Sequence, residues 1–225
     1  MKRVLMLSGT LIVGLSGLRA ASPAGGSLPP EAVSSGRAAA YPNEKTLTDE
    51  KVLFDFEKGP EGWRIPDWAF GKADNAAVGV VWTPEHSSRG RNGLKLVTDF
   101  PPKKWNGAYV EIEREPGAFM DFNGFDLLEV DVFLPENAPM KLKAQFILTV
   151  GEDWTWTEMR QEVELTPGEW TKLKADVRNT SLSWKAPMTD EIRADVRKLG
   201  VRIQSNSTPY LGPVYFDNVR LAKRS

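Results

Sequence analysis

The sequence predicts an all-β protein, a jelly-roll β-sandwich with one short helix. From Val52 onward, apolar residues recur mostly with a period of two, as expected of strands that bury one face. Proline, glycine and asparagine turns separate these runs at short intervals, which is typical of an antiparallel sandwich. The chain contains no cysteine, so disulfides are excluded and the fold must be stabilised by a hydrophobic core.

The amino terminus has the pattern of an export signal. Residues 1–20 begin with Lys2 and Arg3, continue as an apolar run and end in Leu-Arg-Ala. The run is shorter than the roughly 20 residues of a membrane helix, so a secretory signal peptide is predicted and a retained anchor is the alternative. We therefore expect a secreted or periplasmic protein with no membrane attachment after cleavage.

Residues 21–48 are rich in alanine, serine, proline and glycine. Such a segment buries too little apolar surface to offset its chain entropy, and it is predicted to be a flexible tether. The folded domain is expected at 49–222, as a single unit and a monomer.

Ten strands are predicted within that domain, at 52–57, 78–83, 93–98, 107–114, 126–134, 141–150, 156–165, 170–176, 199–205 and 213–222. One helix is predicted from Thr189 to Leu199. Thr189 can cap its start, Ile192, Val196 and Leu199 form one stripe, and Gly200 can end it.

The charge balance and the histidine count exclude several functions. Lysine and arginine total 29 against 30 aspartate and glutamate residues, so the chain has no basic field for nucleic acid. His86 is the only histidine. A metal centre with several histidines is therefore impossible, and a Ser-His-Asp triad would have to use this one residue.

Eight tryptophans are many for 225 residues. Flat aromatic rings flanked by planar hydrogen-bonding groups suit a sugar, which has an apolar face and an edge of hydroxyls. The strand alternation predicts one outer sheet face that carries such a mixture. Its candidate residues for carbohydrate binding are Trp68, Trp105, Trp154, Trp156, Glu111, Gln145, Arg160 and Gln204.

The alternative for any single tryptophan is a place in the core. Trp63, Trp82 and Trp170 are predicted in the core or at its rim, because they adjoin or lie within predicted strands. For Trp184, the sequence does not decide between the core and the surface.

Three sequence segments resemble a known group of proteins. They are Val-Leu-Phe-Asp-Phe-Glu-Lys-Gly-Pro-Glu-Gly-Trp at 52–63, Gly-Leu-Lys-Leu at 93–96 and Gly-Pro-Val-Tyr-Phe-Asp-Asn-Val-Arg-Leu at 212–221. Together they resemble the carbohydrate-binding modules of the galactose-binding-like β-sandwich superfamily. The chain is most similar to the mannan-binding modules of family 27, in which a tryptophan follows a Pro-Lys loop as Trp105 does here.

This resemblance implies a non-catalytic protein that binds β-mannan or a related β-linked plant glycan and works beside a separate glycoside hydrolase. The sugars would stack on Trp68, Trp105 and either Trp154 or Trp156. The resemblance also implies a structural Ca²⁺ held by Glu57 and Asp217. Oxygen ligands suit this hard cation, and Asp55 and the carbonyls near Gly59 and Asn92 could contribute. The alternative is that both carboxylates are solvated turn residues.

Two other functions are considered. Glu129 and Asp131 resemble the alternating acids of a jelly-roll glycosidase family, but that family's third acid is missing here. A polysaccharide lyase could instead use Tyr109, His86, Arg160 and Arg202, although the context of His86 is typical of an exposed loop. A structural sandwich without a glycan ligand is a further possibility, in which all the tryptophans would be buried.

Overall fold

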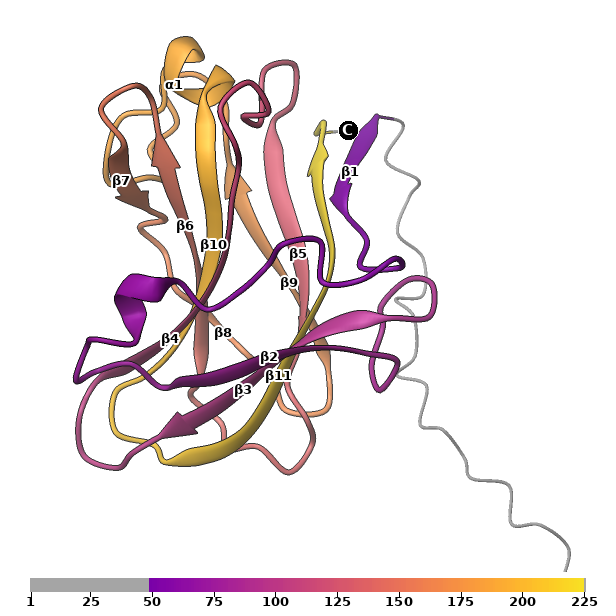
Figure 1. Cartoon of the computed structure of the whole chain (residues 1–225), viewed down its shortest axis with the longest axis vertical. Coiled ribbons are helices and arrows are strands. Elements are labelled where there is room, and N and C mark those ends of the chain that lie inside the picture. Colours follow the sequence, from indigo (N-terminus) through magenta and orange to yellow (C-terminus); the bar gives the residue numbers. More distant parts are fainter. Residues whose placement is uncertain (1–48, 225) are drawn as a thin grey trace, which may run out of the picture. The chain divides into compact units, whose positions relative to one another are not determined.

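The computed structural model of the protein describes residues 49–224 and consists of two antiparallel β-sheets (Figure 1). The predicted signal peptide at 1–20 and tether at 21–48 lie outside the described residues. Of the predicted domain, the strands extend from residue 50 to residue 222. Their bounds are β1 Glu50–Phe54, β2 Ala77–Thr83, β3 Gly93–Phe100, β4 Asn106–Glu113, β5 Leu127–Phe133, β6 Lys143–Val150, β7 Thr155–Glu158, β8 Val163–Glu164, β9 Trp170–Asp176, β10 Val196–Ser205 and β11 Tyr210–Ala222.

Sheet A has the strand order β2-β3-β11-β5-β9, with β1 paired to β11, and sheet B has the order β4-β10-β6-β7, with β8 paired to β6. The strand alternation directs one side of each sheet into a common core. Val110 and Ile112 of β4 pack in the same buried cluster as Val130 and Val132 of β5. Since each sheet buries the apolar side of its strands, the predicted β-sandwich is confirmed.

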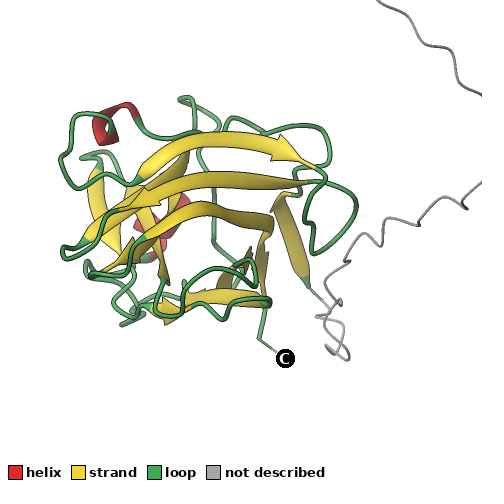
Figure 2. Cartoon of the chain, turned by 90° about the horizontal axis from the view of Figure 1, so that it is seen from below, coloured by secondary structure: helices red, strands yellow, loops and turns green. Residues whose placement is uncertain are grey.

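Helical structure is confined to short segments (Figure 2). A 3₁₀ turn, η1, spans Asp67–Ala69, and α1 spans Asp190–Ala194. Within residues 49–224, no helix is long and apolar enough to cross a membrane.

The predicted helix from Thr189 to Leu199 is mostly wrong. Thr189 does cap α1, because its hydroxyl accepts the N–H of Ile192 at 3.2 Å, but Val196 already begins β10. A register shift between Val196 and Lys198 marks a bulge in the pairing of β10 with β6. The extra residue of a bulge lets Val196 and Leu199, three positions apart, both point into the core, which imitates the spacing of a helix.

The strand predicted at 156–165 is interrupted. It consists of β7 and the two-residue β8, with residues 159–162 between them. At the break, the backbone N–H of Arg160 donates to the Ser183 carbonyl at 2.7 Å instead of to a neighbouring strand.

The remaining tryptophans divide between the core and the surface. Trp63 and Trp184 are buried in the main core, and Trp170 is buried in a small cluster with Phe133 and Tyr215. Trp82 lies on the edge strand β2, is 43% exposed, and donates its indole N–H to the Phe56 carbonyl.

Candidate functional site

The outer face of sheet B brings together most of the predicted binding residues. Its strand register places Tyr109 of β4, Arg202 of β10 and Gln145 of β6 side by side in one row across the sheet. The next row toward one end contains Glu111 and Glu158, and the following row contains Trp156. Alternation within the strands therefore builds a face of aromatic, amide and charged side chains.

Arg202 occupies the centre of this face. Its guanidinium carbon lies 5.4 Å from the centroid of the Trp105 ring and 5.8 Å from that of Tyr109. It forms an ion pair with Glu158, with 2.8 Å between Nη2 and Oε2, and donates a hydrogen bond to the side-chain oxygen of Gln145. The arginine thus holds two aromatic rings and two polar side chains in fixed relative positions.

Gly107 lies beneath these rings. A Cβ atom at this position would come within 2.9 Å of Tyr109 Cε2, 3.1 Å of Trp105 Cη2 and 3.2 Å of Arg202 Cδ. Its backbone N–H donates to the Asp74 carbonyl, and its own carbonyl accepts the N–H of Ala76. The glycine therefore allows the three side chains to converge and ties the segment after η1 to the edge of sheet B.

Trp68, carried by η1, packs over the middle of the face. Its ring centroid lies 4.8 Å from that of Tyr109 and 5.6 Å from that of Trp156, both in edge-to-face geometry. Trp68 is half-buried, whereas Trp156 remains 43% exposed. Three rings contributed by η1, β4 and β7 thus form one continuous aromatic surface.

Glu111 is the buried acid of this surface. Burial raises its pKa, while the charge of Lys198 and a hydrogen bond from Trp68 act in the opposite direction. The Lys198 Nζ lies 3.7 Å from the Glu111 carboxylate. Glu111 is thus held beside the Trp68 ring and is only 7% exposed.

The two predicted glutamines also lie on this face. Gln145 donates to the Met159 carbonyl and accepts from Arg202. Gln204 lies directly opposite Gly107 and Lys143 in the register, and its buried amide oxygen has no hydrogen-bond partner within residues 49–224. A hydrogen bond from Gln204 helps to lower the pKa of Glu162, after the larger effect of Lys143.

Trp154 and Arg160 lie apart from the residues around Arg202. Their predicted positions assume that one strand includes both, but β7 extends only from Thr155 to Glu158. Trp154 adopts φ 53° in the preceding turn and lies near the Arg197 guanidinium and the Lys198 ammonium, 5.0 and 5.8 Å from its ring centroid. Arg160 donates to the carbonyls of Trp184 and Lys185 at 2.8 and 3.3 Å. The predicted placement of Arg160 beside Trp156 is wrong.

The sequence-based selection missed residues that organise the face. From the sequence, Tyr109 and Arg202 are candidates only for a lyase, and Glu158 and Gly107 are not among the candidates. The signal for Arg202 lay in the alternation of β10, since it precedes Gln204 by two positions. The role of Gly107 depends on contacts that no sequence pattern reveals.

Glu57 and Asp217 both hold the segment 87–92. Oε1 of Glu57 accepts the N–H groups of Arg91 and Asn92 at 2.8 and 2.9 Å, and Oδ2 of Asp217 accepts those of Ser88 and Arg89 at 2.7 and 2.9 Å. Asp217 is fully buried, so it is not a solvated turn residue. Burial raises its pKa to about 6, against the hydrogen bonds from Arg89 and Ser88.

Residues 49–224 contain no cluster of three or more histidine, aspartate or glutamate side chains that could hold a metal ion. Glu57 and Asp217 would therefore need backbone carbonyls as the remaining ligands of a Ca²⁺, which this cation accepts.

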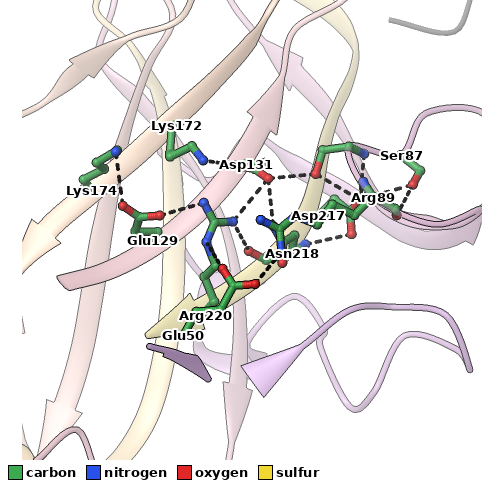
Figure 3. A network of polar contacts seen from close by, with 11 residues as sticks. Glu50, Ser87, Arg89, Glu129, Asp131, Lys172, Lys174, Asp217, Asn218 and Arg220 are labelled. Atoms are coloured by element: carbon green, nitrogen blue, oxygen red, sulfur yellow. Dashed lines mark hydrogen bonds and ion pairs between the residues drawn. The ribbon is translucent and has the colours of Figure 1, made fainter. Parts of the chain in front are cut away.

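The outer face of sheet A carries Glu129 and Asp131, but both side chains are enclosed in a polar network (Figure 3). Arg220, which is also fully buried, lies 2.6 Å from Glu129 and 3.4 Å from Asp131. The Ser88 hydroxyl and the Asn218 amide donate to Asp131 at 2.8 and 3.1 Å. Since catalytic carboxyls of a glycosidase must reach the scissile bond, this buried pair offers no open catalytic site.

His86 covers the same side of the molecule. Its ring stacks on Phe133, with 4.4 Å between the centroids, and meets Tyr215 edge-on at 4.5 Å. Burial lowers its pKa. The predicted loop position of His86 is confirmed, but its side chain is half-buried instead of exposed, because the loop folds back onto the sheet.

No family model matches the sequence, and no curated protein matches it either. Solved structures with similar folds include carbohydrate-binding modules of the β-sandwich type. One is CBM27-1 of Caldicellulosiruptor saccharolyticus in complex with mannohexaose, with TM-score 0.56 and 18% identity over 79% of this chain and 98% of that chain. Another is a CBM28 module specific for non-crystalline cellulose, with TM-score 0.58 and 15% identity over 76% and 93%.

A third, described as a carbohydrate-binding module of the β-sandwich superfamily with promiscuous specificity, has TM-score 0.52 and 16% identity over 75% of this chain and 60% of that longer chain. At these identities the similarity establishes the fold. It does not single out family 27 among the β-sandwich modules.

Proposed function

We propose that the protein is a non-catalytic polysaccharide-binding protein that holds a β-linked glycan, β-mannan first among the candidates, on the outer face of sheet B. The observation that carries this proposal is the aromatic surface formed by Trp68, Tyr109 and Trp156, with Trp105 held by Arg202 beside it. Sugar rings stack on such surfaces while the surrounding amides and charges bond their hydroxyls.

Trp156 is the ring proposed to stack in preference to Trp154. It contacts Trp68 and keeps 43% of its surface exposed, whereas Trp154 contacts none of the other rings of this face and lies near Arg197 and Lys198. The similar structures include a module bound to mannohexaose and one specific for cellulose. These support a β-linked glycan as the ligand class.

The test is affinity electrophoresis of the protein in gels that contain galactomannan, glucomannan, xylan or mixed β-glucan. We expect retardation in the mannan gels and a loss of affinity of about 10- to 100-fold in Trp156→Ala, since a buried ring contributes on the order of 1–3 kcal/mol. Trp82→Ala is the matched control, because Trp82 is equally exposed but lies on sheet A. Free migration in every gel, or equal retention of Trp156→Ala and the parent, would contradict the proposal.

We also propose that Ca²⁺ bound by Glu57 and Asp217 strengthens the attachment of the segment 87–92. Removal of the ion with a chelator is expected to lower the melting temperature, because a ligand that binds only the folded state stabilises it. Glu57→Ala should remove the sensitivity to chelation. A melting temperature that chelation leaves unchanged would show that the backbone hydrogen bonds to the two carboxylates suffice.

Export to the periplasm or the medium is proposed from residues 1–20. It is tested by comparing the mass of the cell-associated and exported chains. A separate glycoside hydrolase acting on the same polymer is the proposed functional partner, and the protein is proposed to act as a monomer.

A further inference from the structure

A depression lies away from the proposed glycan face, where the edge of sheet A meets the segment that follows β7. It encloses about 690 Å³, a size typical of small-molecule sites. Arg160 and Gln161 line it from the segment after β7, Lys174 and Asp176 from β9, and Arg224 from the end of β11. An adjoining hollow of about 410 Å³ shares Asp176, Ser181 and Leu182 with it and adds Arg178.

The lining is strongly basic in a chain whose formal charge is −1. Four cationic side chains, Arg160, Lys174, Arg178 and Arg224, surround one lining acid, Asp176. Arg178 and Arg224 both bond this acid, at 2.6 and 3.2 Å. Lys174 pairs with Glu129 at 3.2 Å. Because Arg178 and Arg224 share one carboxylate and Arg160 has no ion pair within residues 49–224, the cleft keeps a local excess of positive charge, which attracts anions.

Hydrogen bonds to the backbone fix the orientation of the Arg160 guanidinium. Its Nε and Nη2 donate to the backbone carbonyls of Trp184 and Lys185, and it forms no ion pair within residues 49–224. An arginine oriented in this way keeps a charged edge for a carboxylate and loses little conformational entropy when it binds one.

We propose that this cleft binds the carboxylate of an acidic sugar, in a polysaccharide that contains uronate residues. The groups beside the cations are suited to a sugar, because Gln161, Ser181 and Ser183 can bond hydroxyls and the 85% exposed Leu182 offers an apolar contact. The cleft is a binding site additional to the glycan face of sheet B and uses none of its rings.

The experiment is affinity electrophoresis of the full chain in gels that contain polygalacturonate or the same polymer with its carboxyls methyl-esterified. Retardation is expected with the acidic polymer alone and should weaken as salt is added. Arg160→Gln and Arg224→Gln should each weaken binding by about tenfold, as expected for a lost charge-assisted hydrogen bond. The glutamine at position 160 keeps an amide that can donate to the two carbonyls.

Arg114→Gln is the matched control, since Arg114 also donates to a backbone carbonyl, that of Ala118, and lies outside the cleft. Arg224, with half of its side chain exposed, gives a second variant that tests the cleft if Arg160→Gln fails to fold. Equal retardation by the esterified polymer, equal retardation by polyglutamate, or full retention by both variants would overturn the proposal.

The two sites can be tested separately. Trp156→Ala should lose retention by neutral mannan and keep retention by polygalacturonate, while Arg160→Gln should show the reverse. Failure of one proposal therefore leaves the other measurable.

Discussion

The outer faces of the two sheets arise from the same alternation of residues but differ in how completely their side chains are covered. On sheet B, Tyr109, Arg202 and Gln145 form a largely buried row, and the neighbouring Trp156 remains 43% exposed. On sheet A, Glu129 and Asp131 occupy equivalent outward positions and are fully enclosed with Arg220.

The difference lies in the loops that cross each face. The segment 84–92 folds over sheet A, where His86 stacks on Phe133 and Ser88 bonds Asp131. On sheet B, η1 contributes the Trp68 ring, and the segment after η1 bonds the backbone of Gly107 at the edge of the sheet. The loop over sheet A thus seals the outward carboxylate pair completely. On sheet B the charged side chains are also largely buried, but the Trp156 ring beside them remains exposed.

Arg220→Met should produce the largest effect, because it leaves Glu129 and Asp131 buried without their central cation. Breaking a buried ion pair from one side costs about 3–5 kcal/mol of unfolding free energy, measured by urea denaturation. The same change at Arg178, whose side chain is 49% exposed in its pair with Asp176, should lower the unfolding free energy far less, because solvent screens an exposed pair. Equal losses in the two variants would mean that burial of the ion pair does not determine how much it stabilises the fold.

Gly107→Ala tests how the face of sheet B is organised. The added methyl group would collide with Trp105, Tyr109 and Arg202, so glycan affinity should fall by about tenfold, equivalent to ~1.4 kcal/mol. Gly79→Ala is the matched control, because a Cβ at that position in β2 meets no atom within 4 Å. If Gly107 acts by positioning Trp105, the double variant Gly107→Ala/Trp105→Ala should lose little more glycan affinity than Trp105→Ala alone. Additive losses of affinity would show that Gly107 does not act through Trp105.

Glu111→Gln should have the smallest effect, visible as a change in pH dependence. The unfolded chain releases this proton near the ordinary pKa of 4.5, whereas burial raises the pKa in the folded protein. The folded state therefore holds more protons between the two values, and the unfolding free energy of the parent falls as the pH rises from 4.5 through the raised pKa. Glu111→Gln should lack this decline. Parallel curves of unfolding free energy against pH for the two proteins would contradict it.

The sequence determined the fold class and most strands, because period-two alternation follows directly from the pleat of a half-buried sheet. It also determined which residues of β4, β6 and β10 point outward, and so identified Glu111, Gln145 and Gln204. Alternation failed where a strand ended or bulged. It misplaced Arg160 beyond the end of β7, and it extended the helix through Val196 because a bulge imitated helical spacing.

Only the tertiary structure decided which outward residues remain open. Glu129 and Asp131 are sealed beneath a loop, whereas on sheet B the rings of Trp105 and Trp156 stay partly exposed beside buried side chains. The central position of Arg202 and the need for glycine at 107 depend on side chains from three different elements. Contacts between segments so far apart in sequence follow from the packing of loops on sheets, and local sequence patterns do not encode that packing.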